Sequence, residues 1–445
     1  MGRRAGMRRA ATNLMSSRLA GMLGRSFWGL ADQALVSLTS FLTLVLLARV
    51  LTPERYGAFV LFYGALNFFN ALQSGLFTQS HNVLGSSRSG EDYARYTSTT
   101  FLMQFLFSVL LALLAAAGYV VGRMLGWATA DLFLAMTPAI LAWQVQEYLR
   151  RVYYTEGRVR AAFLNDLIGY GGQIVLVIAV WRLDRLNGPV AIYLLALTSA
   201  LAAFVGLYHL RAELAARLEG ASVRENWHFG KWLFGASLVQ SGRIQAHVWL
   251  IGGLVSVTAA GLYRAAQNLV APTHIMMNAV RSVAMPRAAA IYEREGEAAM
   301  RAYLWRMTWL GLAPIVLYLI AVCAVAEPLL HWLYAGQYDG YAWLVYVFAV
   351  IYLLAYLGQI LTVALSAMRV TRAVLFAEVV TIVVAVGAGA PLIAVLGIRG
   401  AMATDVIVGA TLLAALLRLR QLPRPRRTPA PLVSFVPVEV RQHGD

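Results

Sequence analysis

The sequence is poor in charge, in lysine and in cysteine. Only 13% of its 445 residues are charged, whereas 60% are hydrophobic and the mean hydropathy is +0.65. A soluble multidomain protein of this composition would expose too much apolar surface, which excludes that class. The single Cys323 excludes an intrachain disulfide. The only lysine, Lys231, lacks the glycine-rich surroundings of a phosphate-binding loop, so no ATPase site is predicted.

Long apolar stretches are abundant. A helix that crosses a bilayer needs about 20 mostly apolar residues. The predicted spans are 27–50, 57–85, 98–122, 129–153, 161–181, 190–210, 229–253, 259–284, 303–326, 341–367, 373–395 and 398–419. The sequence therefore predicts an all-α integral membrane protein with about 12 transmembrane helices.

The positions of the basic residues along the chain indicate whether the protein binds nucleic acid or membrane lipid. A net charge of +16 would suggest nucleic acid in a soluble protein. Here most of the 37 Lys and Arg residues lie in every second gap between spans, which is the positive-inside bias of a membrane protein with both termini in the cytoplasm. We expect membrane lipid as a partner and no nucleic acid. The strong preference for arginine over lysine suggests a GC-rich bacterium, and hence a bacterial cytoplasmic (inner) membrane.

The chain divides into two similar halves. The segment 160–166 resembles 372–378, each with a basic residue six positions before an acid, and Gly57 corresponds to Gly261. Repeats six spans apart insert in the same orientation. This predicts two six-helix bundles related by pseudo-two-fold symmetry around a central cavity. The predicted parts are a cytoplasmic basic interfacial segment (1–26), the two bundles (27–211 and 229–420), a cytoplasmic linker (212–228) and a disordered cytoplasmic tail (421–445).

The opening of the chain carries a family resemblance. The runs LADQALVSLTSF at 30–41 and LARVLTPERYGAF at 47–59 resemble the opening of the polysaccharide transporters, in the multidrug/oligosaccharidyl-lipid/polysaccharide exporter superfamily. The resemblance implies a flippase that moves a polyprenyl-diphosphate-linked oligosaccharide from the inner to the outer leaflet by alternating access. A glycan polymerase partner would be compatible with it. The second half retains only Gly261 and Tyr263 of this signature, so the resemblance assigns no functional residue there.

Arginines inside the predicted spans are the first candidates for substrate binding. A charge at membrane depth costs about 2.5–3.5 kcal/mol, so it usually faces a cavity or a partner. On a helix of 3.6 residues per turn, Gln240, Arg243 and His247 share one face of the seventh span. Arg264 and Arg281 share one face of the eighth. With Arg281 near the cytoplasm, Arg243 at mid-membrane and Arg264 near the outer face, these guanidinium groups would offer a crossing diphosphate successive bidentate partners.

A structural role for these arginines stays open. They could pair with acids in other spans, or extend to an interface from the span ends. The acids in question are Asp32, Asp166, Glu378 and Asp405.

Polar residues in the first half supply further candidates. Asn67, Asn70 and His81 lie on one face of the second span, where they would suit sugar hydroxyls or, alternatively, hydrogen bonds between helices. Asp32 and Asp166 could bind H⁺ or Na⁺ and couple transport to an ion gradient, unless they form fixed salt bridges. No metal site and no cofactor are expected, apart from such ion coupling.

Other functions fit the sequence less well. A multidrug exporter of the same superfamily would favour acids and aromatic residues in its cavity, whereas the arginines favour an anionic head group. A glycan polymerase, glycosyltransferase or ligase would need catalytic groups in a large outer loop. The longest outward gap, 327–340, contains Glu327, His331 and Asp339 without metal-site spacing. The chain is therefore not expected to be an enzyme.

Overall fold

The computed structural model describes residues 27–214 and 218–419 of the chain. These residues form helices joined by short connections and contain no β-strand. The predicted all-α class is therefore confirmed. The predicted interfacial segment 1–26 and tail 421–445 lie outside the described residues.

The first half begins with the helix Phe27–Val50, and its other elements follow in chain order. These are α2 (Pro53–Gln73), the π-helix η1 (Ser74–Thr78), α3 (Gln79–Leu84), η2 (Gly85–Ser87), α4 (Gly90–Met124), α5 (Ala130–Thr155), α6 (Val159–Asp166), the π-helix η3 (Leu167–Gly171), α7 (Gly172–Arg182), α8 (Gly188–His209) and α9 (Arg211–Leu214).

The second half begins with a long helix that starts inside the predicted linker 212–228. Its elements are α10 (Gly220–Leu254), α11 (Val257–Val270), α12 (Pro272–Glu295), α13 (Glu297–Ala324), α14 (Ala326–Tyr334), α15 (Ala342–Ala367), α16 (Thr371–Gly387), α17 (Gly389–Leu396) and α18 (Ile398–Leu419). The predicted eighth span is divided between α11 and α12 at Pro272, because proline has no backbone N–H to donate.

Eight helices of the described chain are long and apolar enough to cross a membrane. They are Phe27–Val50, Gly90–Met124, Val159–Arg182, Gly188–His209, Glu297–Ala324, Ala342–Ala367, Ala373–Leu396 and Ile398–Arg418. The other four predicted spans are also helical, in α2 to α3, in α5, in α10 and in α11 to α12. These four are less apolar because they carry the polar groups that the two halves turn toward each other or bury within a bundle. Together the twelve spans form a multi-pass membrane protein.

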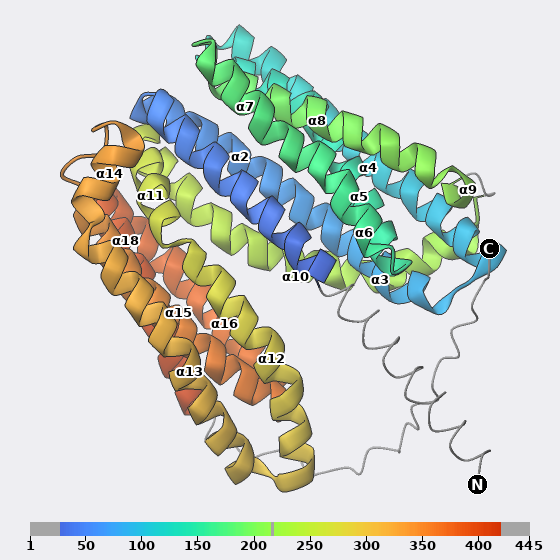
Figure 1. Cartoon of the computed structure of the whole chain (residues 1–445). Coiled ribbons are helices and arrows are strands. Elements are labelled where there is room, and N and C mark those ends of the chain that lie inside the picture. Colours follow the sequence, from blue (N-terminus) through green and yellow to red (C-terminus); the bar gives the residue numbers. More distant parts are fainter. Residues whose placement is uncertain (1–26, 215–217, 420–445) are drawn as a thin grey trace, which may run out of the picture.

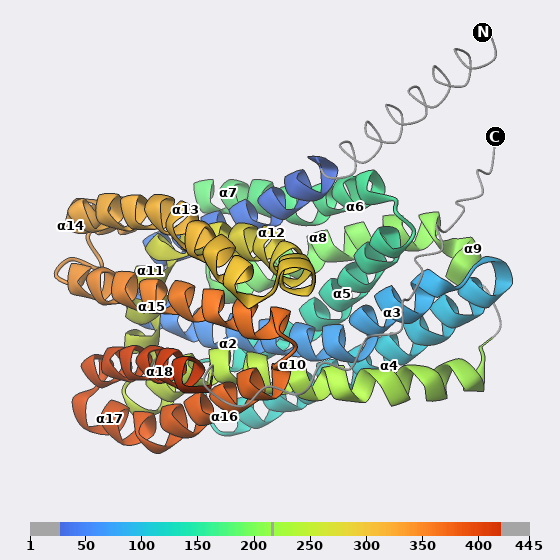
Figure 2. The ribbon, with the colours of Figure 1, turned by 90° about the horizontal axis from the view of Figure 1, so that it is seen from below.

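The two halves meet at one end and diverge at the other. In Figure 1 the helices of the first half and those of the second half approach each other where α2 and α11 begin, and separate toward the turn between α12 and α13. Figure 2 shows α13 to α18 on one side of the view and α3, α5, α6 and α9 on the other, with α10 running alongside α4. We call the joined end the closed end and the separated end the open end.

Two equivalent glycines meet at the closed end. A Cβ atom on Gly57 of α2 would collide with the carbonyl oxygen of Val257, and one on Gly261 of α11 would lie 2.6 Å from the carbonyl oxygen of Pro53. Only glycine permits backbones to approach so closely. Because Gly57 and Gly261 are corresponding residues of the predicted repeat, their contact is the one expected on a pseudo-two-fold axis.

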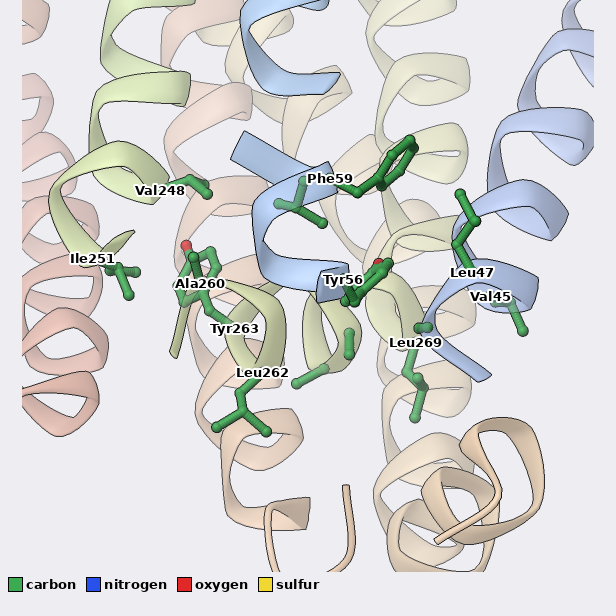
Figure 3. Packing of buried hydrophobic residues seen from close by; sticks show 14 of the residues in the cluster. Val45, Leu47, Tyr56, Phe59, Val248, Ile251, Ala260, Leu262, Tyr263 and Leu269 are labelled. Carbon is green, nitrogen blue, oxygen red and sulfur yellow. The ribbon is translucent and has the colours of Figure 1, made fainter. Parts of the chain in front are cut away.

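Apolar side chains from both halves fill the space around this crossing. Figure 3 shows them converging from Phe27–Val50 and α2 on one side and from α10 and α11 on the other. The labelled residues are Val45, Leu47, Tyr56, Phe59, Val248, Ile251, Ala260, Leu262, Tyr263 and Leu269. Removing this much apolar surface from water or lipid contact favours closure of this end.

Polar contacts add to the closure. The guanidinium of Arg49 donates to the carbonyl oxygens of Trp332 and Leu333, and Gln337 Nε2 donates to Arg49 O over 2.7 Å. Between the halves, Asn268 Nδ2 donates to the Tyr56 hydroxyl over 3.2 Å. These bonds link the first half to α11, α14 and the loop after α14.

Helix α10 packs against the first half for most of its length. A Cβ atom on Gly75 would lie 2.5 Å from Ser237 Oγ, and one on Gly230 would lie 2.5 Å from Leu76 O. Near the start of α10, Asn226 Nδ2 donates to Leu76 O over 3.1 Å, and Arg88 pairs with Glu225. Helix α10 is thus a second-half element held by first-half contacts, which matters for the site below.

Candidate functional site

The guanidinium of Arg150 organises a polar cluster inside the first half. Its NH2 group lies 2.5 Å from Asp32 Oδ2, its Nε lies 2.6 Å from Asp166 Oδ2, and its NH1 lies 3.5 Å from Glu147 Oε1. The side chains of Asp32 and Asp166 are fully buried, and those of Arg150 and Glu147 are 14% and 13% exposed. Buried acids that share one cation hold the helices carrying them in a fixed arrangement.

Neighbouring hydroxyl and amide groups complete this Arg150 cluster. Tyr154 Oη donates to Asp32 Oδ2 over 2.5 Å, and Gln146 Nε2 donates to Asp166 Oδ1 over 3.3 Å. Tyr170 Oη donates to Glu147 Oε1 over 2.6 Å. Tyr170 belongs to the π-helix η3, which directly follows Asp166; such single π-turns are frequent at functional sites.

The charge balance of the Arg150 cluster allows it to take up a cation. Three carboxyl groups surround one guanidinium, so full ionisation leaves uncompensated negative charge in a buried place. Burial disfavours such charge unless a proton or a metal cation neutralises it. The structure brings Asp32 and Asp166, each predicted separately as an ion-coupling candidate, to the same guanidinium, and so gives them the salt-bridge partner that the sequence had left open.

A second polar cluster joins α10 to α11, α16 and α18. Arg243 Nε lies 3.6 Å from Glu378 Oε2, with the two side chains 33% and 35% exposed. One turn later, His247 Nε2 lies 3.3 Å from Asp405 Oδ2, which also accepts a 2.7 Å hydrogen bond from the Tyr263 hydroxyl. Arg243, His247 and Asp405 line a cavity of about 290 Å³ between α10, α16 and α18. Its remaining lining is almost entirely apolar.

The two other predicted arginines differ from Arg243. Arg264 is half-buried, and its NH1 donates to Gln267 Oε1 over 2.6 Å. It is close enough to act electrostatically on Tyr56 and Tyr63 of α2 and on Tyr352 of α15, so it lies between the two halves. Arg281 of α12 is exposed.

Neither Arg264 nor Arg281 forms a salt bridge with any residue in the described ranges. Each guanidinium is therefore available to an anion. On the seventh span, Gln240 is exposed on α10, in the turn before Arg243.

The predicted polar face of the second span is divided. Asn67 Nδ2 donates to Tyr63 O of its own helix over 2.7 Å, and Asn70 is half-buried with its Oδ1 unpaired among the described residues. His81 follows the alternative of hydrogen bonding between helices rather than that of a cavity residue. It is fully buried in the first half, with Nε2 3.0 Å from Thr97 Oγ1 and the ring stacked on Tyr96. His81 therefore does not face a cavity in this structure, because α4 packs over it.

Sequence reasoning missed the residue at the centre of the first cluster. Arg150 lies near the end of a predicted span and was grouped with the basic residues of a cytoplasmic gap, whereas α5 continues to Thr155. The spacing of Glu147, Arg150 and Tyr154 at three and four residues was the available signal, since such residues share a helix face. Glu378 and Asp405 had been considered only as partners for the arginines; Glu378 does pair with Arg243, whereas Asp405 faces His247.

Known proteins share both the sequence pattern and the fold. A sequence family described as "Polysaccharide biosynthesis protein" matches residues 46–343. No curated protein sequence gives a match. Among solved structures, an inward-facing multidrug resistance MATE family transporter of the MOP superfamily is 12% identical with a TM-score of 0.70, covering 88% of this chain and 97% of its own.

Two further solved structures are similar to this chain. The lipid II flippase MurJ, in an inward closed conformation, is 13% identical with a TM-score of 0.69, covering 89% of this chain and 88% of its own. An outward-facing MATE transporter is 12% identical with a lower TM-score of 0.58, covering 90% and 94%. The two-bundle transporter fold is thus confirmed.

Proposed function

The chain belongs to the polysaccharide biosynthesis protein family, and from this premise we propose that it is a flippase for a polyprenyl-diphosphate-linked oligosaccharide. The lipid-linked sugar would pass from the inner to the outer leaflet by alternating access, while the polyprenyl tail stays in the bilayer. The fold of transporters and of a lipid II flippase supports this proposal. It also favours transport over a membrane polymerase or ligase.

The observation that carries the proposal is the position of Arg264. Its guanidinium lies between the halves, near the closed end, without a carboxylate partner among the described residues. An unpaired arginine at membrane depth is costly unless it serves a ligand. A diphosphate suits it because the planar guanidinium fork binds phosphate oxygens in pairs and stays charged when desolvated.

Orientation follows from charge and shape together. The open end carries the predicted cytoplasmic gaps, and the closed end carries the predicted outer gaps. We propose that the termini are cytoplasmic and that the bilayer is a bacterial inner membrane. In this orientation the structure is ready to receive substrate from the cytoplasmic side, where lipid-linked sugars are assembled.

The energy source proposed is an ion gradient acting at the Arg150 cluster. Protonation of, or Na⁺ binding at, Asp32 and Asp166 would neutralise excess negative charge around Arg150 and loosen its hold on the helix Phe27–Val50 and on α6. Asp166→Asn should leave the protein in the membrane and remove the dependence of flipping on an imposed gradient. Unchanged gradient-dependent flipping by Asp166→Asn in vesicles would contradict this coupling role.

The test of the flippase proposal is translocation of a purified lipid-linked oligosaccharide in reconstituted vesicles, read by accessibility of the sugar to an external lectin. Arg264→Ala should reduce flipping by about 100-fold or more, as expected for the loss of a charge-assisted phosphate contact of about 3 kcal/mol. Arg264→Lys should recover only part of it, since an ammonium cannot bind two oxygens in the fork geometry. Arg243→Ala should also abolish flipping if the diphosphate contacts the arginines in turn.

A cationic drug exporter is the second candidate, favoured by the MATE likeness and by the acids of the Arg150 cluster. The same vesicles separate the two functions. Export of organic cations that survives Arg264→Ala, with no flipping of the lipid-linked sugar by the unmodified protein, would replace the flippase proposal.

A further inference from the structure

His247 and Asp405 are titratable, close together and outside the Arg150 cluster. We propose that they form a proton-binding site of the second half, through which protonation holds α10 against α18. The site is separate from the ion coupling proposed at Asp32 and Asp166. It does not depend on what the protein transports.

The geometry of the pair is that of a site ready to receive a proton. His247 Nε2 and Asp405 Oδ2 are 3.3 Å apart, yet they are not aligned as a hydrogen bond. Oδ2 already accepts the Tyr263 hydroxyl, which fixes the carboxyl group. The side chains of His247 and Asp405 are 12% and 19% exposed and reach the cavity between α10, α16 and α18, which gives a proton access.

The donor set selects a proton over a metal cation. Hard cations such as Na⁺ prefer several oxygen ligands, whereas one neighbour of this carboxylate is an imidazole nitrogen and the other is a hydroxyl that donates to it. Imidazole titrates near neutral pH and becomes a donor at both ring nitrogens when protonated. Protonated His247 would then face the Asp405 carboxylate as an ion pair.

Other charged and titratable groups lie around the His247–Asp405 pair. Arg243 of α10 is another cation near the pair; it forms an ion pair with Glu378 of α16 and also acts electrostatically on Asp405. The remaining titratable groups that face the site are Tyr263 and Arg264 of α11 and Tyr352 of α15. The tyrosines stay neutral and the arginines stay charged near neutral pH, so His247 and Asp405 account for the change.

The consequence lies in what the pair connects. Helix α10 packs on the first half through Gly230 and Asn226, whereas Asp405 belongs to α18 of the second half. Tyr263 is two residues from Gly261, the glycine that contacts Gly57 at the closed end. A proton on His247 Nε2 adds attraction between α10 and α18, and so favours the arrangement seen here, in which the closed end is joined and the open end is separated. Release of the proton removes the ion pair and favours separation of the two halves at the closed end.

The experiment measures how pH shifts the distance between the halves at the open end. Spin labels are placed on cysteines introduced at the exposed Ser86 and Glu295, in a Cys323→Ala background. Double electron–electron resonance is recorded between about pH 5 and 8, the range in which histidine titrates. Falling pH should raise the population of the long distance that corresponds to this inward-open arrangement. His247→Gln and Asp405→Asn should each lose this response.

Two further variants make the result specific. His228→Gln removes an exposed histidine of the same helix and should leave the response intact. Tyr263→Phe keeps both titrating groups but removes the hydroxyl that stabilises the carboxylate, so the midpoint should move to higher pH. This variant tests the proposal even if Asp405→Asn fails to fold.

The proposal is overturned if the parent protein shows no pH response, or if His247→Gln retains the full response. Because the measurement contains no lipid-linked sugar, its outcome is independent of the flippase proposal. A normal pH response without flipping would contradict the flippase function only. Flipping without a His247-dependent response would contradict the proton site only.

Discussion

Asp166 of the first half and Glu378 of the second half occupy corresponding positions of the repeat, and the structure uses them in opposite ways. Asp166 is fully buried and pairs with Arg150 of its own half over 2.6 Å. Glu378 is 35% exposed and pairs with Arg243 over 3.6 Å, on a helix that packs against the other half. The first pair holds one bundle together, whereas the second links two bodies that must move apart.

This difference explains how one repeated fold can serve both stability and motion. A buried ion pair that loses one partner leaves an uncompensated charge and is costly to break. An ion pair that is one third exposed is screened by solvent, so it exchanges partners at little cost. The first half is therefore the rigid body, and the contacts of α10 with α16 and α18 form the adjustable boundary.

Among the variants that test this difference between the halves, Arg150→Ala should have the largest effect. Removing the guanidinium leaves Asp32, Glu147 and Asp166 unpaired, and the loss should be about 3–5 kcal/mol in the free energy of unfolding. Thermal unfolding can be followed by the reaction of a thiol-specific dye with the single Cys323. Arg243→Ala is the matched control and should unfold near the parent temperature. Equal destabilisation by both variants would contradict the proposed difference between the halves.

Substitutions of Gly57 and Gly261 should have similar effects on the closed end, unlike substitutions of the two acids Asp166 and Glu378. Gly57→Ala and Gly261→Ala each place a Cβ atom against backbone of the other half, and each should destabilise the closed end by about 1–3 kcal/mol. Spin labels at Ser86 and Glu295 should then report fewer molecules in the inward-open arrangement. Gly253→Ala serves as the control, because its Cβ would meet nothing within 4 Å. A wild-type distance distribution in Gly57→Ala would show that close approach is not required.

The smallest effect is expected for Glu378→Gln. Its partner Arg243 is 33% exposed, so the variant should change the free energy of unfolding by only about 0.2–1 kcal/mol. Flipping of the lipid-linked sugar should persist in vesicles, since Arg243 becomes more available to a phosphate. A drop in stability comparable to that of Arg150→Ala would show that the Arg243 pair is structural.

Much of the fold could be predicted because lipid restricts the alternatives. Helices satisfy their own backbone hydrogen bonds, so runs such as 341–367 and 398–419 had to be spanning helices, and the structure has α15 and α18 there. Gly57 and Gly261, which the predicted repeat relates, lie in contact in the structure. The break between α11 and α12 at Pro272 and the two π-helices were not predicted, because apolar composition alone is insensitive to a local change of helical winding.

The site was predicted less completely. Helical projection grouped Arg243 with His247 on one face of α10, and the structure has both lining one cavity. Asp32 and Asp166 were selected separately, and the structure shows that they share Arg150. Projection gave no neighbours from other helices, so it could not decide whether His81 faces a cavity or bonds to another helix; in the structure α4 covers it. It also could not show that Arg150 reaches both acids.

The sequence by itself determined which segments enter the membrane and which side chains carry charge there, because unpaired backbone groups and charged side chains are costly in lipid. Only the tertiary structure decided which charged side chains form ion pairs with one another. Arg150 and Arg243 are the same residue type on two helices, yet Arg150 pairs with two fully buried acids and with Glu147, whereas Arg243 pairs with a single carboxylate that is one third exposed. Electrostatic interactions depend on distance and burial, and both are set by how separate helices pack.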